Sequence, residues 1–283
     1  MDKSAAEAVS FSFGKNWAQF VAEHFSDERV RIAREHLTGF LDTSSLAGKS
    51  FVDAGCGSGL HSLAAFDAGV AKLVSFDLDP FSVETTARLR KLRGDPANWT
   101  VLRGSVLDTA FLGTLEPADI VYSWGVLHHT GHMWQAIENT SALLKPEALF
   151  YIALYVTTPL SGYWLAVKKR YNAASPARKR LMEAGYAIRR EILPRLIRGH
   201  NPVKEIWTYR QKRGMDYLTD VRDWLGGYPY EDASIPEVMS FCRKKLGLEL
   251  INLGPSPTLA EYLFSNARAG RPSVSHAAVP GST

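Results

Sequence analysis

A glycine-rich turn and one carboxylate are the residues of this sequence with the clearest potential for chemistry. The turn Asp53–Gly59 (DAGCGSG) follows an apolar run typical of a buried strand and precedes a stretch with helical spacing. Glycines at such a turn let a ligand reach backbone N–H groups at a helix N-terminus. Asp77 ends the next apolar run, where a carboxylate is placed to accept hydrogen bonds from a ribose diol. This order of strand, turn, helix, strand and acid predicts a nucleotide-type ligand.

The spacing of the glycines disfavours a nicotinamide cofactor. The dinucleotide fingerprint Gly-x-Gly-x-x-Gly needs a third glycine, which would fall at Ser62 when read from Gly57 and at Leu60 when read from Gly55. Neither position is glycine. The turn therefore predicts a ligand other than a nicotinamide cofactor.

A pair of histidines supplies a second candidate for chemistry. His128 and His129 follow the apolar run 120–127, and imidazoles with a pKa near neutrality suit general base catalysis. The alternative is that one of them caps the following helix or packs under the cofactor. His132 completes a trio that resembles metal ligands, but Gly131 intervenes and no carboxylate joins the group. We therefore expect no metal site here.

The elements that must position these residues alternate in type along the chain. Short apolar runs indicate strands, and stretches of helical spacing separate them, as in a series of βαβ units. Strands are predicted at 51–55, 73–76, 100–102, 120–123, 149–155, 248–253 and 261–265, and helices at 59–68, 80–93, 132–145 and 235–246. Two amphipathic helices are predicted over residues 14–41.

The motifs resemble those of a known family. The pattern Asp53-x-Gly55-x-Gly57-x-Gly59 with Asp77 looks like the first two motifs of class I S-adenosylmethionine-dependent methyltransferases, and residues 120–129 resemble their fourth-strand motif. Residues 118–155, with the Leu-Lys-Pro turn 144–146, are similar to the ubiquinone-biosynthesis type of small-molecule methyltransferase. The resemblance covers about residues 48–155 and the terminal strands.

The resemblance implies a fold, a cofactor and a set of binding residues. The fold would be α/β, a three-layer Rossmann-like seven-stranded sheet with N-terminal helices and an inserted helical cap after the fifth strand. S-adenosylmethionine would lie with its methionine part in the 53–59 turn, its ribose on Asp77 and its adenine beside Leu78, Ser105 and Val106. Many relatives have an aspartate where this chain has Ser105. The predicted cofactor-binding residues are Asp53, Gly55, Cys56, Gly57, Gly59, Asp77, Leu78, Ser105, Val106 and Trp124.

The domain organisation is predicted from the points where the alternation starts and stops. We expect an N-terminal helical lid over 1–47, the cofactor-binding core over 48–155 and a basic aromatic cap over 156–232. The core is completed by 233–267, and a disordered tail is expected over 268–283.

The predicted cap concentrates the positive charge of the chain. Residues 155–215 contain 14 Lys and Arg against three Glu, a net charge of +11, whereas the remainder of the chain carries −7. Such a segment attracts anions, among them phosphate, carboxylate, nucleic acid and lipid surfaces, unless it is only a solvated face. Lys168 and Lys179 are expected on its outer side.

The aromatic residues of the cap leave three interpretations open. A substrate lid would hold a flat or anionic small molecule, with Tyr155, Trp164, Arg210 and Tyr228 as the candidate contacts. An RNA surface would use the same residue types, with rings on bases and cations on phosphates. The rings also suit the core of the cap itself. The position after the fifth strand favours the lid.

Composition limits the class of protein. With 46% hydrophobic and 22% charged residues and no apolar run of the roughly 20 residues that a spanning helix needs, the chain is expected to be soluble, without a membrane span. The N-terminus lacks the features of a secretion signal, and Cys56 and Cys242 cannot form a disulfide framework. A cytoplasmic location is the expectation.

The sequence thus predicts an enzyme that transfers a methyl group from S-adenosylmethionine to a small, aromatic or anionic molecule by in-line displacement at the sulfonium. Transfer to oxygen is favoured over nitrogen or carbon, with His128 and His129 as the catalytic residues. The alternative is an RNA methyltransferase that uses the cap, and a third interpretation is a non-catalytic cofactor-binding module.

Overall fold

Seven strands form the central sheet of the protein. The computed structural model of the chain describes residues 14, 21, 25–197 and 217–266. The strand order is β3-β2-β1-β4-β5-β7-β6. The strands are β1 (Ser50–Ala54), β2 (Lys72–Asp77), β3 (Trp99–Arg103), β4 (Ala118–Trp124), β5 (Leu144–Tyr155), β6 (Glu249–Gly254) and β7 (Leu259–Ser265).

The first five strands are parallel, and β7 lies antiparallel to both β5 and β6. All seven predicted strands are confirmed. The fifth strand is longer than predicted, because it begins at Leu144 and continues through Pro146. The helix predicted over 132–145 accordingly ends at Ser141.

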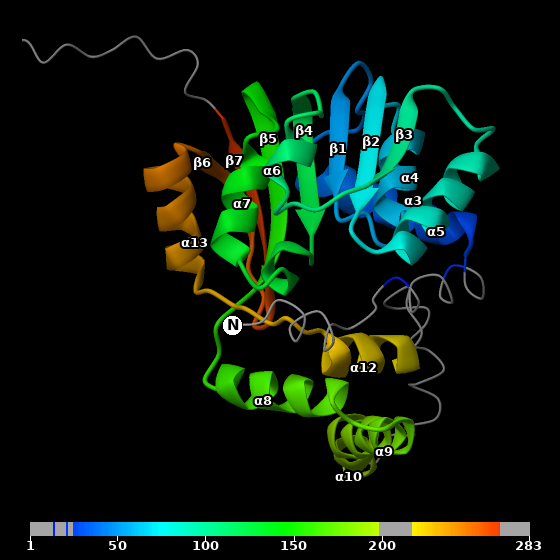
Figure 1. The fold of residues 1–283 in the computed structure, drawn as a ribbon, viewed down its shortest axis with the longest axis vertical. Coiled ribbons are helices and arrows are strands. Elements are labelled where there is room, and N and C mark those ends of the chain that lie inside the picture. Colours follow the sequence, from blue (N-terminus) through cyan, green and yellow to red (C-terminus); the bar gives the residue numbers. More distant parts are fainter. Residues whose placement is uncertain (1–13, 15–20, 22–24, 198–216, 267–283) are drawn as a thin grey trace, which may run out of the picture.

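Helices cover both faces of the sheet, which gives the three layers that were predicted (Figure 1). On one face, side chains of α3 (Asp27–Phe40), α4 (Leu60–Asp67) and α5 (Pro80–Leu92) pack on Phe51, Tyr122 and Tyr151. On the other face, α6 (Thr109–Leu112), α7 (Met133–Ser141) and α13 (Ile235–Phe241) pack on Val121 and Phe150. Because both faces are covered, the central strands are buried almost throughout.

Local sequence determines where several of these helices begin. The carboxylate of Asp79 accepts a hydrogen bond from the Phe81 N–H at the start of α5, and Pro80 occupies the first helical position. Ser234 and Glu237 form a reciprocal capping box at the start of α13. That helix ends in a π-helical turn, Cys242–Leu246. The α5 cap also fixes the loop that follows Asp77.

The segment inserted after β5 is helical, as predicted. It contains α8 (Ser161–Asn172), α9 (Pro176–Ala187), the π turn Ile188–Ile192, α10 (Leu193–Ile197) and α12 (Tyr217–Gly226). These helices lie beyond the carboxyl ends of the parallel strands (Figure 1). Tyr171, Val221 and Leu225 form a small hydrophobic core of their own. The chain rejoins the sheet through a bridge between Val156 and Ala233.

Two predictions concern residues that the structure covers only partly. Of the two helices predicted over 14–41, the second is α3, whereas most of the first lies outside the described residues. The predicted tail 268–283 also lies outside them. Within the described ranges, no helix combines the length and apolar character needed to cross a membrane.

Candidate active site

A cavity of about 1500 Å³ opens at the carboxyl ends of β1, β2, β4 and β5. This is the edge at which parallel α/β sheets bind their ligands. The walls come from the 53–61 turn, the ends of β2 and β3, the 122–130 segment, Tyr155, α3, the 223–229 segment and the start of β7. Core and inserted segment therefore share one cavity.

The glycine turn forms one wall through backbone conformations that other residues rarely adopt. Gly55, Gly57 and Gly59 have φ angles of +84°, +53° and +75°. A Cβ atom on Gly55 would lie 2.4 Å from a methyl carbon of Val126, and one on Gly59 would lie 2.7 Å from Thr86 Oγ1. Gly55 and Gly57 line the cavity, whereas Gly59 packs against α5. The glycines thus shape the turn in two ways, by conformation and by close packing.

Asp77 is held rigidly beside this turn. Its Oδ2 accepts a hydrogen bond of 2.9 Å from the Gly57 N–H, and its Oδ1 accepts one of 2.9 Å from the Asp79 N–H. Burial raises the pKa of Asp77 to about 6, although these backbone hydrogen bonds oppose the shift. Each carboxylate oxygen can accept a second hydrogen bond. The carboxylate is therefore suited to hold a pair of hydroxyl groups.

Asp53 lies deeper, at the start of a buried chain of hydrogen bonds. Ser62 Oγ donates to Asp53 Oδ2 at 2.5 Å and lies 2.7 Å from Ser75 Oγ, which accepts a bond of 2.9 Å from Trp99 Nε1. Burial raises the pKa of Asp53 to about 7, partly offset by the bond from Ser62. The pKa of Asp53 is thus close to neutral pH, and the carboxyl lies at the floor of the cavity.

Cys56 lies in the same turn and is buried. Its Sγ accepts a hydrogen bond from Thr86 Oγ1 at 3.3 Å, and burial raises the pKa of the thiol well above its usual value. A thiol in that state is a poor nucleophile. Cys56 therefore contributes packing to the turn.

The predicted adenine contacts line the cavity beyond Asp77. Leu78 is 62% exposed, and Ser105 and Val106, which follow β3, line the same cavity. Ser105 Oγ accepts a hydrogen bond of 3.1 Å from the Leu107 N–H, which closes a turn. Leu78 and Val106 thus present apolar surface to the cavity.

Trp124 belongs to a polar cluster that the sequence did not reveal. Its Nε1 donates to Glu261 Oε1 at 2.6 Å, and the same carboxylate accepts a bond of 2.7 Å from Tyr151 and approaches His36 Nε2 at 3.2 Å. Burial raises the pKa of Glu261, but these three partners outweigh it and hold the pKa at about 2. Glu261 is the one acid in the apolar strand β7, a signal that could have indicated its role.

His61 lies next to this cluster. Its ring centroid is 6.2 Å from that of Trp124 and 6.5 Å from that of His36. Burial lowers the pKa of His61 to about 4, and the neighbouring His36 adds to the shift. Glu261 and the neutral His61 ring together fix the orientation of Trp124.

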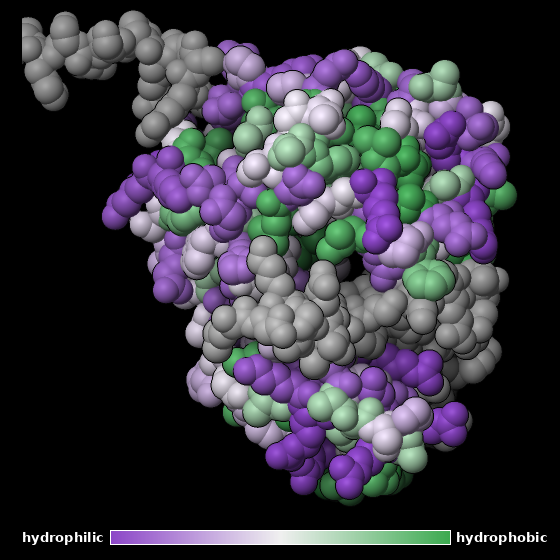
Figure 2. Space-filling view, in the orientation of Figure 1, coloured by the Kyte–Doolittle hydropathy of each residue, from purple (hydrophilic) through white to green (hydrophobic). Residues whose placement is uncertain are grey.

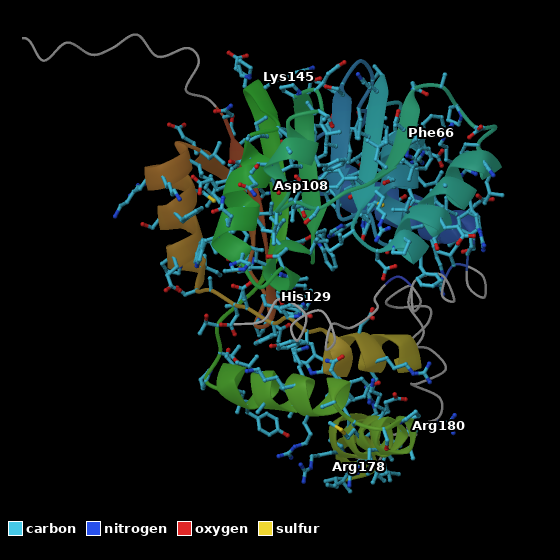
Figure 3. All side chains as sticks on the ribbon, viewed as in Figure 1. Phe66, Asp108, His129, Lys145, Arg178 and Arg180 are labelled. Carbon is cyan, nitrogen blue, oxygen red and sulfur yellow. The ribbon has the colours of Figure 1, made fainter. Side chains whose placement is uncertain are left out.

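The predicted histidine pair forms another wall of the same cavity. His129 lies where the core meets the inserted helices (Figure 3), and its Nδ1 donates to the Pro229 carbonyl at 2.6 Å. The neutral ring therefore carries its lone pair on Nε2. Burial lowers the pKa of His129 to about 3, and Lys168 contributes to the shift.

His128 is fully buried, and neither of its ring nitrogens has a hydrogen-bond partner among the described residues. Burial, followed by the nearby His129 and Lys168, lowers its pKa well below the usual value. Its ring centroid lies 4.0 Å from that of Tyr155, and both side chains line the cavity. Unpaired buried nitrogens are costly unless a ligand satisfies them.

Lys168 corrects one expectation from the sequence. It was expected on the outer side of the cap, but it is fully buried. Its Nζ donates to the Trp224 carbonyl and lies 4.7, 5.1 and 5.7 Å from the ring centroids of Trp224, Tyr230 and Tyr155. Burial lowers the pKa of Lys168 to about 7. Lys168 is buried because α8 packs against α12, which carries Trp224.

The structure separates the four predicted substrate contacts. Tyr155 and Tyr228 line the cavity. Trp164 packs instead in the hydrophobic core of the inserted helices, with its ring centroid 5.1 Å from that of Trp224. Arg210 lies outside the described residues.

The sequence of the core is similar to known methyltransferases. Residues 52–150 match a family model described as a methyltransferase domain. A tRNA U34 carboxymethyltransferase from Methylococcus capsulatus is 27% identical over 126 residues, which make up 44% of this chain and 38% of that protein. A ribosomal protein L11 methyltransferase from Aeromonas hydrophila subsp. hydrophila is 43% identical over 47 residues, 17% of this chain and 16% of that protein. The chain thus spans less than two fifths of the length of these relatives.

Solved structures share the fold. A magnesium protoporphyrin IX methyltransferase from Synechocystis PCC 6803 with bound SAH superposes with a TM-score of 0.54 at 12% identity, over 93% of this chain and 99% of that one. An O-methyltransferase family protein from Burkholderia thailandensis gives a TM-score of 0.52 at 12% identity, over 86% of this chain and 59% of that one. The chain is thus similar in sequence to a methyltransferase domain over residues 52–150, and it shares its fold with these solved methyltransferases.

Proposed function

We propose that this protein transfers a methyl group from S-adenosylmethionine to a small-molecule acceptor, with a hydroxyl oxygen favoured over nitrogen or carbon. One observation carries the proposal. A single cavity is lined both by a fixed carboxylate beside a glycine turn, Asp77, and by a pair of buried neutral histidines. The first feature suits a nucleoside, and the second suits an acceptor that carries a proton.

The residues on the nucleoside side fit the cofactor. Asp77 is oriented by two backbone N–H groups and has acceptor capacity left for a ribose diol. Gly55 and Gly57 bring backbone to the cavity surface, where the methionine part would lie against Asp53. Leu78 and Val106 provide apolar surface for adenine. When bound, the sulfonium supplies an already activated methyl group.

With an activated donor, the remaining work of the protein is to orient the acceptor and exclude water. A neutral imidazole accepts a hydrogen bond from a hydroxyl, and His128 has two unsatisfied nitrogens in the wall of the cavity. The buried Lys168 opposes a positive charge on either histidine. His128 and His129 therefore orient the hydroxyl and accept its proton only as its oxygen bonds to the methyl group. Tyr155 closes this side against water.

Calorimetry with S-adenosylhomocysteine tests the cofactor half of the proposal. Binding of S-adenosylhomocysteine without binding of NAD is the expected result. Micromolar affinity for NAD with no response to S-adenosylhomocysteine would overturn the proposal.

The histidines are tested by turnover with an acceptor found by screening hydroxylated aromatic and anionic compounds for S-adenosylhomocysteine release. His128→Ala and His129→Ala should lower turnover much more than cofactor affinity, because the acceptor proton moves in the transition state. Near-normal turnover in both variants would leave positioning by the cavity as the only catalytic device.

An RNA acceptor is the second candidate, and the charge of the inserted segment favours it. Residues 155–215 carry a net charge of +11, and one curated relative is a tRNA U34 carboxymethyltransferase. An enzyme that binds single-stranded RNA through many phosphates loses affinity steeply as salt is raised. The logarithm of its binding constant falls with the logarithm of the salt concentration with a slope of about −0.7 per phosphate contact. Tight RNA binding with such a slope would replace the small molecule by RNA as the acceptor.

A further inference from the structure

The inserted helices carry a row of exposed aliphatic side chains that the proposed reaction does not use. Leu181 lies on α9, Ile188 in the π turn, and Leu193, Leu196 and Ile197 on α10. Each is between 51% and 77% exposed. Single exposed leucines are common on protein surfaces, but a contiguous group on one helical run marks an interaction site. We call these five residues the apolar ridge.

The π turn aligns the apolar ridge along one side of the helical run. An α-helix advances about 100° per residue, and a π turn, whose hydrogen bonds join residues five apart, advances about 80°. With that correction all five side chains fall within an arc of about 100°. A continuous α-helix would place Leu193 and Ile197 well outside this arc. The π turn precedes Pro194, which cannot donate a backbone hydrogen bond.

The opposite side of α9 is already occupied. Met182 and Tyr186 pack into the hydrophobic core with Tyr171. Glu183 is buried there, where it accepts a hydrogen bond of 2.6 Å from Tyr171 and one of 3.3 Å from Arg222. On α9 the apolar ridge is therefore a second apolar face, because the first one already packs against the other inserted helices.

Positive charge surrounds the apolar ridge. Residues 176–197 contain six Lys and Arg against two Glu, and Glu183 forms an ion pair with Arg222 inside the hydrophobic core. Arg178, Arg180 and Arg189 are exposed. Figure 3 shows Arg178 and Arg180 at the end of the molecule farthest from the sheet, and hydrophobic and hydrophilic surfaces adjoin there in Figure 2.

We propose that the apolar ridge and its flanking arginines form a docking surface for an anionic lipid bilayer. Aliphatic side chains on one side of a helix, bordered by Arg, enter the boundary between headgroups and acyl chains, while the cations meet lipid phosphates. Charge complementarity selects this occupant. A second copy would bring two strongly positive surfaces together, and RNA gains little from aliphatic side chains because its bases stack on rings.

Flotation of the full chain with vesicles tests the proposal. The vesicles are phosphatidylcholine alone and phosphatidylcholine with phosphatidylglycerol added. Wild type should float with the anionic vesicles, less so as salt is raised. The pair Leu181→Ser and Ile197→Ser should weaken partitioning more than about tenfold, because two aliphatic side chains that enter the bilayer are lost. The pair Arg178→Glu and Arg180→Glu should abolish the preference for anionic vesicles.

Leu92→Ser is the matched control. Leu92 is 58% exposed at the end of α5, between Lys91 and Arg93, but on the core. Its removal should leave flotation unchanged. All variants should bind S-adenosylhomocysteine as wild type does, which shows that they are folded and separates this test from that of the proposed function.

Three results would overturn the proposal. The first is wild type that stays with neither vesicle, and the second is equal flotation of the Leu181/Ile197 pair and wild type. The third is that no vesicle binding is seen and the wild type instead forms a dimer in sedimentation, or a complex in RNA titration. That dimer or complex would also have to be lost with the same substitutions.

Discussion

The ionisable groups in two walls of the cavity are all buried, and burial shifts the pKa values of the two walls in opposite directions. On the carboxylate wall, Asp53 and Asp77, burial raises the pKa values to about 7 and about 6. On the imidazole wall, His128 and His129, burial lowers them, to about 3 in the case of His129. Burial favours the neutral form on both sides.

The walls differ in what holds each group. Asp77 accepts two backbone hydrogen bonds, which favour its charged form, so further donors from a ligand would complete its ionisation. His128 has no hydrogen-bond partner among the described residues, and Lys168 adds repulsion to any charge there. The carboxylate wall therefore favours an ionised Asp77 once a ligand donates hydrogen bonds to it, whereas the imidazole wall keeps its histidines neutral.

Replacing the carboxylate that carries the charge should have the largest effect. Asp77→Ala should weaken binding of S-adenosylhomocysteine by about 1.5 to 3 kcal/mol, since a charge-assisted hydrogen bond to a diol is lost. Calorimetry measures the change. Asp108→Ala is the control, because Asp108 caps α6 and does not line the cavity. Equal affinity of the folded Asp77→Ala protein and wild type would remove the distinction between the walls.

Lys168, which lies next to the imidazole wall, should lower the stability of the folded protein. The pKa of Lys168 falls from 10.5 to about 7 on folding, because burial disfavours its charge. The unfolded chain then binds more protons than the native protein between these values, so the cost of burying Lys168 grows as pH falls from 10.5 to 7 and is constant below.

Lys168→Met should therefore stabilise the protein at pH 7 by on the order of 2 kcal/mol, after allowance for the lost bond to Trp224 and the ring contacts. Denaturant unfolding at several pH values measures this, and the stabilisation should shrink as the pH is raised from 7 towards 10.5, because Lys168 then loses its charge in the unfolded chain as well. Lys179→Met is the control, since Lys179 lies over Tyr171 near the surface. A destabilised Lys168→Met protein at pH 7 would show that the aromatic rings more than compensate for burial.

Low pH should weaken ligand binding, because it protonates Asp77 in the carboxylate wall. Protonation of Asp77, with a pKa of about 6, removes acceptors that the diol needs. Affinity for S-adenosylhomocysteine should be flat from pH 8 to about 7 and fall below pH 6, by at most about tenfold per pH unit. Asp77→Asn should flatten this profile. If the slope persists in Asp77→Asn, the titrating group is Asp53.

The core and the carboxylate wall follow from local sequence. All seven strands and the glycine turn were predicted, because apolar runs, glycines at positive φ and an acid at a strand end are short-range signals. The extension of β5 through Pro146 was missed, since proline in a strand usually indicates a break.

The polar partners of the imidazole wall and of Trp124 required tertiary structure. Glu261 reaches Trp124 across 137 positions, because β7 inserts antiparallel beside β5. Lys168 has the sequence context of a surface cation, and only the packing of α8 on α12 buries it. Contacts between segments so far apart leave no local pattern to interpret.

The smallest change in ligand affinity is expected when Trp164 is replaced. This residue is a predicted substrate contact that the structure places in the core of the inserted helices. Its ring lies against Trp224 and Tyr186, and it does not line the cavity. Trp164→Leu should destabilise the inserted helices, yet change affinity for S-adenosylhomocysteine by less than about 0.5 kcal/mol, because distant sites are nearly additive. Thermal unfolding and calorimetry on the same protein separate the two effects. A large loss of affinity would mean that the inserted helices and the carboxylate wall are coupled, and that the two walls do not act independently.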